Sequence, residues 1–93
     1  MIQIAVNPEE IRACFAVMHQ LRTHLVLDAF VEQVQRQQAH GYHLAFLLGA
    51  IGPVAVAGYR YGLNLAWGRF LYVDDLVTDS EHRGQGAGQK MLA

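Results

Sequence analysis

The chain has 93 residues, of which 53% are hydrophobic and 16% are charged, and its formal net charge is -1. A chain of this length supports one hydrophobic core, which buries about 60–65% of the surface exposed on unfolding, so the composition indicates one folded domain. A disordered chain would have fewer apolar residues, a transmembrane helix would need about 20 consecutive apolar residues, and a nucleic-acid groove would need excess positive charge. These exclusions predict a cytoplasmic protein that binds neither membranes nor nucleic acid.

The first part of the chain predicts one strand followed by one helix. The apolar residues 2–6 suit a short strand. Asn7 and Glu10 then flank a proline in the pattern of a capping box, which predicts a helix over residues 8–22. Cys14 belongs to the apolar face of this helix and is expected to be a small core residue.

The next part predicts a second helix and two strands. Asp28 is expected to cap the helix and Gly41 to end it. Residues 42–48 and 54–61 are rich in aromatic and aliphatic side chains, which is typical of strands. Gly58 lies within the second of these strands, so we expect a bulge or a close approach of another group at that position.

A turn at residues 62–64, a third strand over residues 69–78 and a loop at residues 79–83 lead to a final helix. The predicted order of elements is therefore β-α-α-β-β-β-α. Short turns return each strand beside the one before it, so most of the pairing is antiparallel. The sequence thus predicts an α+β fold with a mixed, largely antiparallel sheet flanked by helices.

A glycine-rich segment between the last strand and the final helix is the strongest functional signal. Glycines at alternate positions let the backbone approach a ligand and leave the first N–H groups of the helix pointing outward, an arrangement that attracts phosphate. Gln89 and Lys90 follow the segment, so neither a P-loop nor a dinucleotide-binding fingerprint fits. The simpler alternative is a loop that only turns a corner. The segment consists of Arg83, Gly84, Gln85, Gly86, Ala87 and Gly88.

The spacing of Arg83, Gly86 and Gly88 resembles the acetyl-CoA signature of the GNAT N-acetyltransferase superfamily, Gln/Arg-x-x-Gly-x-Gly/Ala. The element order also resembles the N-terminal part of the acyl-CoA N-acyltransferase fold of that family. The resemblance implies that residues 83–89 bind the CoA pyrophosphate. It also implies that the strand backbone binds the pantetheine arm at Leu76, Val77 and Thr78.

The reaction implied by the resemblance is transfer of acetyl from acetyl-CoA to the amine of a small molecule or peptide. The amine must lose a proton, so a general base is needed, and Asp74 and Asp75 are the candidates. Consecutive strand residues point to opposite faces, so the two carboxylates are not expected to share a proton unless a bulge intervenes. Asp75 alternates with Leu71, Val73 and Val77 and is expected to be the more desolvated. Alternatively, both aspartates have only structural roles.

Five aromatic residues are candidates for lining an acceptor pocket, although aromatic residues are also favoured in strands for packing alone. The histidines lack the spacing of a helical zinc site, so no metal site is expected. The aromatic residues are Tyr59, Tyr61, Trp67, Phe70 and Tyr72.

Members of the family continue well beyond the glycine-rich segment, whereas this chain stops at Ala93. The resemblance therefore implies a single domain over residues 1–93 that is incomplete at its C-terminus. Without the further elements, the strand over residues 69–78 is an open edge, from which we expect a homo-oligomer. The alternative to an acetyltransferase is a truncated or degenerate module that binds CoA or a protein without catalysis.

Overall fold

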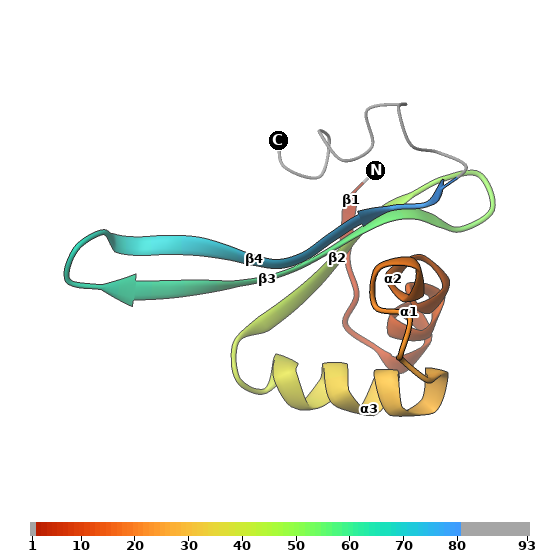
Figure 1. The fold of residues 1–93 in the computed structure, drawn as a ribbon, viewed down its shortest axis with the longest axis horizontal. Helices are drawn as coiled ribbons and strands as arrows, with labels where there is room; N and C mark the ends of the chain where they lie inside the picture. The colour runs from red at the N-terminus through yellow and green to blue at the C-terminus, as the bar shows by residue number, and fades with distance from the viewer. Residues whose placement is uncertain (1, 81–93) are drawn as a thin grey trace.

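The computed structural model describes residues 2–80, which form one sheet with helices packed on one of its faces (Figure 1). The strands are antiparallel and follow the order β1-β2-β3-β4, so strands that are consecutive in sequence are neighbours in the sheet. The predicted α+β class is confirmed, and the predicted final helix lies outside the described residues. The elements are β1 (Ile2–Ile4), α1 (Pro8–Ala13), α2 (Phe15–Leu21), α3 (Leu27–Gln38), β2 (Tyr42–Leu48), β3 (Pro53–Asn64) and β4 (Gly68–Thr78).

The first helix begins with the predicted capping box. The Asn7 side chain accepts a hydrogen bond from the Glu10 N–H at 2.8 Å, and Glu10 Oε1 accepts one from the Asn7 N–H at 3.3 Å. The prediction of one helix over residues 8–22 is wrong, because the chain divides at Cys14 into α1 and α2. The Cys14 N–H donates to the Ile11 carbonyl, a tighter turn than that of an α-helix. This break lets both short helices direct apolar side chains into the core.

The ends of α3 agree only in part with expectation. Its N-cap is Val26, whose side chain makes no capping bond, and Asp28 lies inside the first turn, so the predicted Asp28 cap is wrong. An acidic residue in the first turn still interacts favourably with the helix dipole. Beyond the other end, Gly41 has a left-handed φ of 92°, which glycine adopts without strain, so the helix stops before it as predicted.

The strands of the long β3–β4 hairpin extend well beyond the helices (Figure 1). β2 covers the predicted residues 42–48, but the predicted turn at residues 62–64 is wrong because β3 continues through it. The ring of Phe70 lies over its strand partner Gly62, where an added Cβ would be 2.6 Å from Phe70 Cε1. An aromatic ring on a neighbouring strand covers the backbone that a glycine leaves exposed, so Gly62 is compatible with a strand.

The pairing of β3 with β4 shifts by one residue at a bulge. Gly58 pairs with Asp75, whereas the next residue of β3 pairs with Val73, so Asp74 is the extra residue of β4. Gly58 also lies against Tyr42, because an added Cβ would overlap the Tyr42 hydroxyl and lie 2.6 Å from Tyr42 Cζ. Both expectations for Gly58 are therefore confirmed, since it lies at a bulge and permits a close approach.

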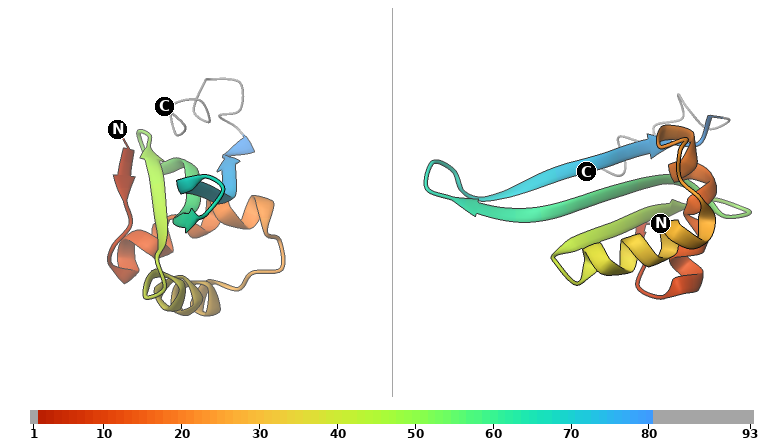
Figure 2. Two further views of the ribbon diagram at one scale, coloured as in Figure 1. Left: turned by 90° about the vertical axis from the view of Figure 1, so that its left-hand side faces the viewer. Right: turned by 60° about the horizontal axis from the view of Figure 1, so that its bottom comes forward.

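The core lies between the sheet and the helices, which gather on one side of it (Figure 2). Cys14 is fully buried there, as predicted, and burial together with the charge of Glu10 raises the pKa of its thiol to about 12. The thiol is therefore protonated and inert at neutral pH. No helix within residues 2–80 is long and apolar enough to cross a membrane. The core residues from the sheet are Tyr42, Leu44, Phe46, Val56 and Val77.

Replacing Gly58 with alanine is expected to destabilise the fold, because the added methyl group overlaps the Tyr42 side chain. Overpacking of this kind lowers the free energy of unfolding by about 1–3 kcal/mol, which urea denaturation measures. The matched control is Gly58→Ala in a Tyr42→Ala background, where the space is empty and the penalty is expected to disappear. Equal penalties in the two backgrounds would contradict the steric explanation.

Candidate functional site

Each of the two predicted aspartates forms an ion pair with its own arginine. Asp75 Oδ1 accepts a hydrogen bond from Arg22 Nε at 2.8 Å and lies 2.7 Å from Arg22 Nη2. Asp74 Oδ2 accepts one from Arg60 Nε at 2.9 Å and lies 2.8 Å from Arg60 Nη2. Arg22 is the C-cap of α2, whereas Arg60 lies on the neighbouring strand β3. This arrangement differs from a carboxylate pair that shares one proton, because each carboxylate has a separate cation.

The bulge decides which face of the sheet Asp75 occupies. Asp75 shares the helix-covered face with the core residue Val77, as predicted. The extra residue Asp74 moves Leu71 and Val73 to the opposite face, so the predicted alternation of Asp75 with these two residues is wrong. The Asp75 side chain is 16% exposed and that of Asp74 is 24% exposed. Asp75 is therefore the less exposed aspartate, as expected.

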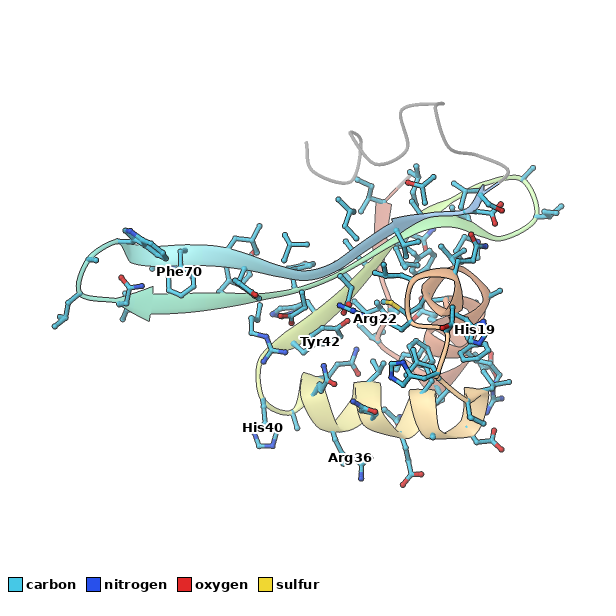
Figure 3. The ribbon with its side chains drawn as sticks, in the orientation of Figure 1. His19, Arg22, Arg36, His40, Tyr42 and Phe70 are labelled. Carbon is cyan, nitrogen blue, oxygen red and sulfur yellow. The ribbon has the colours of Figure 1, made fainter. Side chains whose placement is uncertain are left out.

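Tyr42 lies between the two ion pairs. Its hydroxyl donates to Asp75 Oδ2 at 3.5 Å, a long hydrogen bond, and its ring centroid lies 5.6 Å from Arg60 Cζ. Burial of Tyr42 and the negative charges of Asp75 and Asp74 raise the pKa of the hydroxyl, which keeps it protonated as a donor. Figure 3 shows Tyr42 and Arg22 converging from β2 and from the end of α2.

Arg22, Tyr42 and Arg60 are site residues that the sequence patterns did not identify. Arg22 is 53 residues from Asp75, so only the tertiary structure reveals their contact. Tyr42 and Arg60 pair directly across β2 and β3, which becomes visible once the strand register is known. The one local signal was the glycine at position 58, because a glycine among large strand residues leaves space for a neighbouring side chain.

A cavity of about 300 Å³ opens beside Asp75, between α3, the end of α2 and the sheet. This volume lies at the low end of the range for small-molecule sites. Asp75 is in its lining, whereas Asp74 is not. The cavity therefore combines a carboxylate, a guanidinium and a tyrosine hydroxyl with both apolar side chains and the polar side chains of a histidine and two glutamines. Its lining residues are Met18, Arg22, His24, Leu25, Phe30, Gln33, Val34, Gln37, Tyr42 and Asp75.

The end of β4 is held against α2. The Ser80 N–H donates to Gln20 Oε1 at 2.8 Å, and Gln20 Nε2 donates to Asp79 Oδ1 at 2.6 Å. Residues 76–78, which precede this contact, pair with β3, and β4 is the edge strand of the sheet formed by residues 2–80. The other residues predicted to bind CoA lie outside the described residues. They are Arg83, Gly84, Gln85, Gly86, Ala87, Gly88 and Gln89.

None of the five aromatic residues considered for an acceptor pocket is in the lining of this cavity, which is described from residues 2–80. The rings of Tyr59 and Tyr61 instead lie 5.2 Å and 5.8 Å from that of His43, and Trp67 packs edge-on against Phe70 at 5.6 Å. These contacts favour the alternative, in which the rings pack along the strands. Within the described part of the chain, no group of three or more side chains is arranged to hold a metal ion.

Three solved structures illustrate what the fold resembles. A GNAT family acetyltransferase from Staphylococcus aureus is 16% identical with a TM-score of 0.86, and the match covers 99% of this chain and 71% of that one. Glucosamine-6-phosphate N-acetyltransferase from Arabidopsis thaliana is 17% identical with a TM-score of 0.76, and the match covers 99% of this chain and 69% of that one. A Trypanosoma brucei acetyltransferase is 12% identical with a TM-score of 0.77, and the match covers 99% of this chain and 68% of that one. At these identities the similarity shows the acyl-CoA N-acyltransferase fold.

The sequence comparison agrees with the structural one. No curated protein sequence matches the chain at a significant level. The family model described as acetyltransferase (GNAT) family, however, matches residues 4–93, which is nearly the whole chain. Together with the antiparallel sheet and flanking helices of the fold, this match shows that the chain belongs to the GNAT acetyltransferase family.

Proposed function

We propose that the chain binds acetyl-CoA and transfers its acetyl group to the amine of an acceptor. The position of Asp75 is the observation that carries the proposal. Its carboxylate lines the cavity, and it directly precedes residues 76–78, which the family resemblance assigns to the pantetheine arm. An acceptor in the cavity would therefore have its amine beside the acetyl end of a cofactor bound along β4.

Two segments would hold the cofactor. Because β4 is the edge strand of the described sheet, its outer backbone groups can bind an extended ligand much as they would bind another strand. The glycine-rich residues 83–89 supply backbone N–H groups and the Arg83 guanidinium for the pyrophosphate. The strand residues that contact the pantetheine arm are Leu76, Val77 and Thr78.

Acetyl-CoA supplies the activated acetyl group, and a C–N bond forms to the acceptor as the C–S bond breaks and CoA leaves as the thiol. Asp75 accepts the proton that the amine loses, directly or through a water molecule. Arg22 donates to Asp75 Oδ1 and Tyr42 donates to Oδ2, so both carboxylate oxygens are oriented. Asp74 pairs with Arg60 outside the cavity lining, and the geometry therefore supports Asp75 as the base.

Ligand binding and turnover test the proposal separately. A ligand at about 100 times its dissociation constant adds about 2.7 kcal/mol to the free energy of unfolding. Acetyl-CoA is therefore expected to raise the melting temperature, whereas ATP and NAD at the same concentration are not, and an amine acceptor is expected to release the CoA thiol. Stabilisation without thiol release would favour the non-catalytic CoA-binding module. No stabilisation near millimolar acetyl-CoA would contradict the proposal.

The Asp75→Asn variant is expected to lower kcat/KM by about 10²–10⁴-fold because it removes the general base. Stabilisation by acetyl-CoA is expected to persist. Steady-state release of the CoA thiol measures the rate, and circular dichroism checks the fold.

Two matched variants make this test specific. Asp28→Asn makes the same chemical change on the exposed first turn of α3 and is expected to leave the rate unchanged. Asp74→Asn distinguishes the two candidate bases. An unchanged rate in Asp75→Asn, or a larger loss in Asp74→Asn, would contradict the role assigned to Asp75.

We also propose that the chain self-associates through the first part of β4, which includes Leu71 and Val73 and precedes the residues assigned to the cofactor. Leu71 and Val73 are 53% and 36% exposed on this edge strand, and apolar edge strands pair with other chains. The weight-average mass in sedimentation is expected to rise with concentration, and Leu71→Lys is expected to suppress the rise. Leu63→Lys, an exposed position on β3, is the control. A monomer at every concentration would contradict this assembly.

A further inference from the structure

The described lining of the cavity contains one permanently positive side chain, Arg22, and one negative side chain, Asp75. Two Arg22 nitrogens, Nε and Nη2, contact the same oxygen of Asp75, Oδ1, at 2.8 and 2.7 Å. This is not the geometry of two parallel N–H···O bonds that a guanidinium and a carboxylate form when they pair most strongly. A ligand with an ammonium group and a carboxylate close together matches the two side chains charge for charge.

The ion pair can open for such a ligand at little cost. The Arg22 side chain is 48% exposed, and ion pairs in contact with water contribute little to stability. The new contacts, from Asp75 to an ammonium and from Arg22 to a carboxylate, are charge-assisted and lie in a cavity that is partly shielded from water. Tyr42 still holds Asp75 through Oδ2 while Arg22 moves.

The inner part of the cavity is apolar and its mouth is polar. The buried lining residues are apolar except for Tyr42, and burying a ligand's methyl and methylene groups against them is favourable. The exposed lining residues carry polar groups, so charged parts of a ligand can stay near the mouth. The floor comprises Met18, Phe30 and Val34, and the mouth comprises Arg22, His24 and Gln33.

We infer that the acceptor is a free α-amino acid with an apolar side chain. Asp75 binds its ammonium group, Arg22 binds its carboxylate, and its side chain packs against the floor. This inference rests on the acetyl transfer proposed above and names the acceptor for that reaction. The ammonium loses one proton toward Asp75 and the amine gains the acetyl group, so the products are an N-acetyl amino acid, the CoA thiol and one proton.

Other amines fit this lining less well. A polyamine is best bound by several carboxylates, whereas Asp75 is the one carboxylate in the described lining and Arg22 repels a second ammonium group. The N-terminal residue of a peptide has an amide where the free amino acid has its carboxylate. Arg22 would therefore lose its ion pair with Asp75 without gaining a charged partner. Preferred binding of a polyamine or of a peptide N-terminus is therefore a competing outcome of the test.

Acceptors that differ in one group test the inference with the full chain and acetyl-CoA. L-leucine is compared with L-leucinamide, which lacks the carboxylate charge, and with isopentylamine, which lacks the carboxylate. Losing a hydrogen bond to a charged group weakens binding about 10- to 100-fold. The value of kcat/KM for leucine is therefore expected to exceed the values for leucinamide and for isopentylamine by about this factor. Calorimetric titration of the same compounds into the CoA-saturated chain gives a ranking that does not depend on turnover.

Variants of Arg22 show whether the preference comes from this side chain. Arg22→Gln is expected to reduce the ratio of kcat/KM for leucine to that for leucinamide to near 1. Because Arg22 also orients Asp75, the absolute rates of both acceptors are expected to fall, so the ratio is the quantity that tests the inference. Arg22→Lys keeps the charge and is expected to retain part of the preference. Arg36→Gln is the matched control, because Arg36 lies on the side of α3 that faces away from the cavity (Figure 3) and its loss is expected to leave the ratio unchanged.

The outcomes separate this inference from the proposed function. Equal or better binding and turnover of leucinamide, leucyl-glycyl-glycine or spermidine would overturn the amino-acid acceptor and leave acetyl transfer standing. An unchanged ratio in Arg22→Gln, or acetyl-CoA binding without any binding of leucine, would overturn it as well. If acetyl-CoA itself does not bind, the proposed function fails first.

Discussion

The candidate site depends on the absence of a side chain at Gly58. The Tyr42 side chain occupies the space where a Cβ would be, and its hydroxyl thereby crosses β3 to reach Asp75 on the next strand. Side chains on alternate strands of a sheet are normally separated by the side chains of the strand between them. Contact of this kind therefore needs a position without a side chain on the middle strand. A larger residue at position 58 would displace Tyr42, and the cavity would lose both a wall and the donor that orients its carboxylate.

Local signals in the sequence predicted the local structure well. The capping box at Asn7, the strand at residues 42–48 and the special role of Gly58 all follow from interactions within a few residues or from one residue's size. The turn predicted at residues 62–64 failed for a different reason. The glycine there lies within a strand and is covered by the Phe70 ring, and that pairing depends on the register of β3 with β4.

The site was predictable only in part. Asp75 could be proposed because it lies on the strand before the glycine-rich segment, but its orientation depends on the bulge at Asp74, which reverses the alternation of the residues before it. Arg22 and Arg60 could not be proposed, because each reaches its aspartate from another element. Partly exposed ion pairs contribute only about 0–1 kcal/mol each, so they orient these groups more than they stabilise the fold, and they leave no local sequence pattern.

Helix α2 contacts two parts of the proposed site. Gln20 of α2 holds Asp79 and Ser80, where the chain leaves β4, and Arg22 at the end of the same helix holds Asp75 at the cavity. A displacement of α2 therefore alters both contacts together. The position of this one helix therefore bears on both the exit of β4 and the orientation of the Asp75 carboxylate.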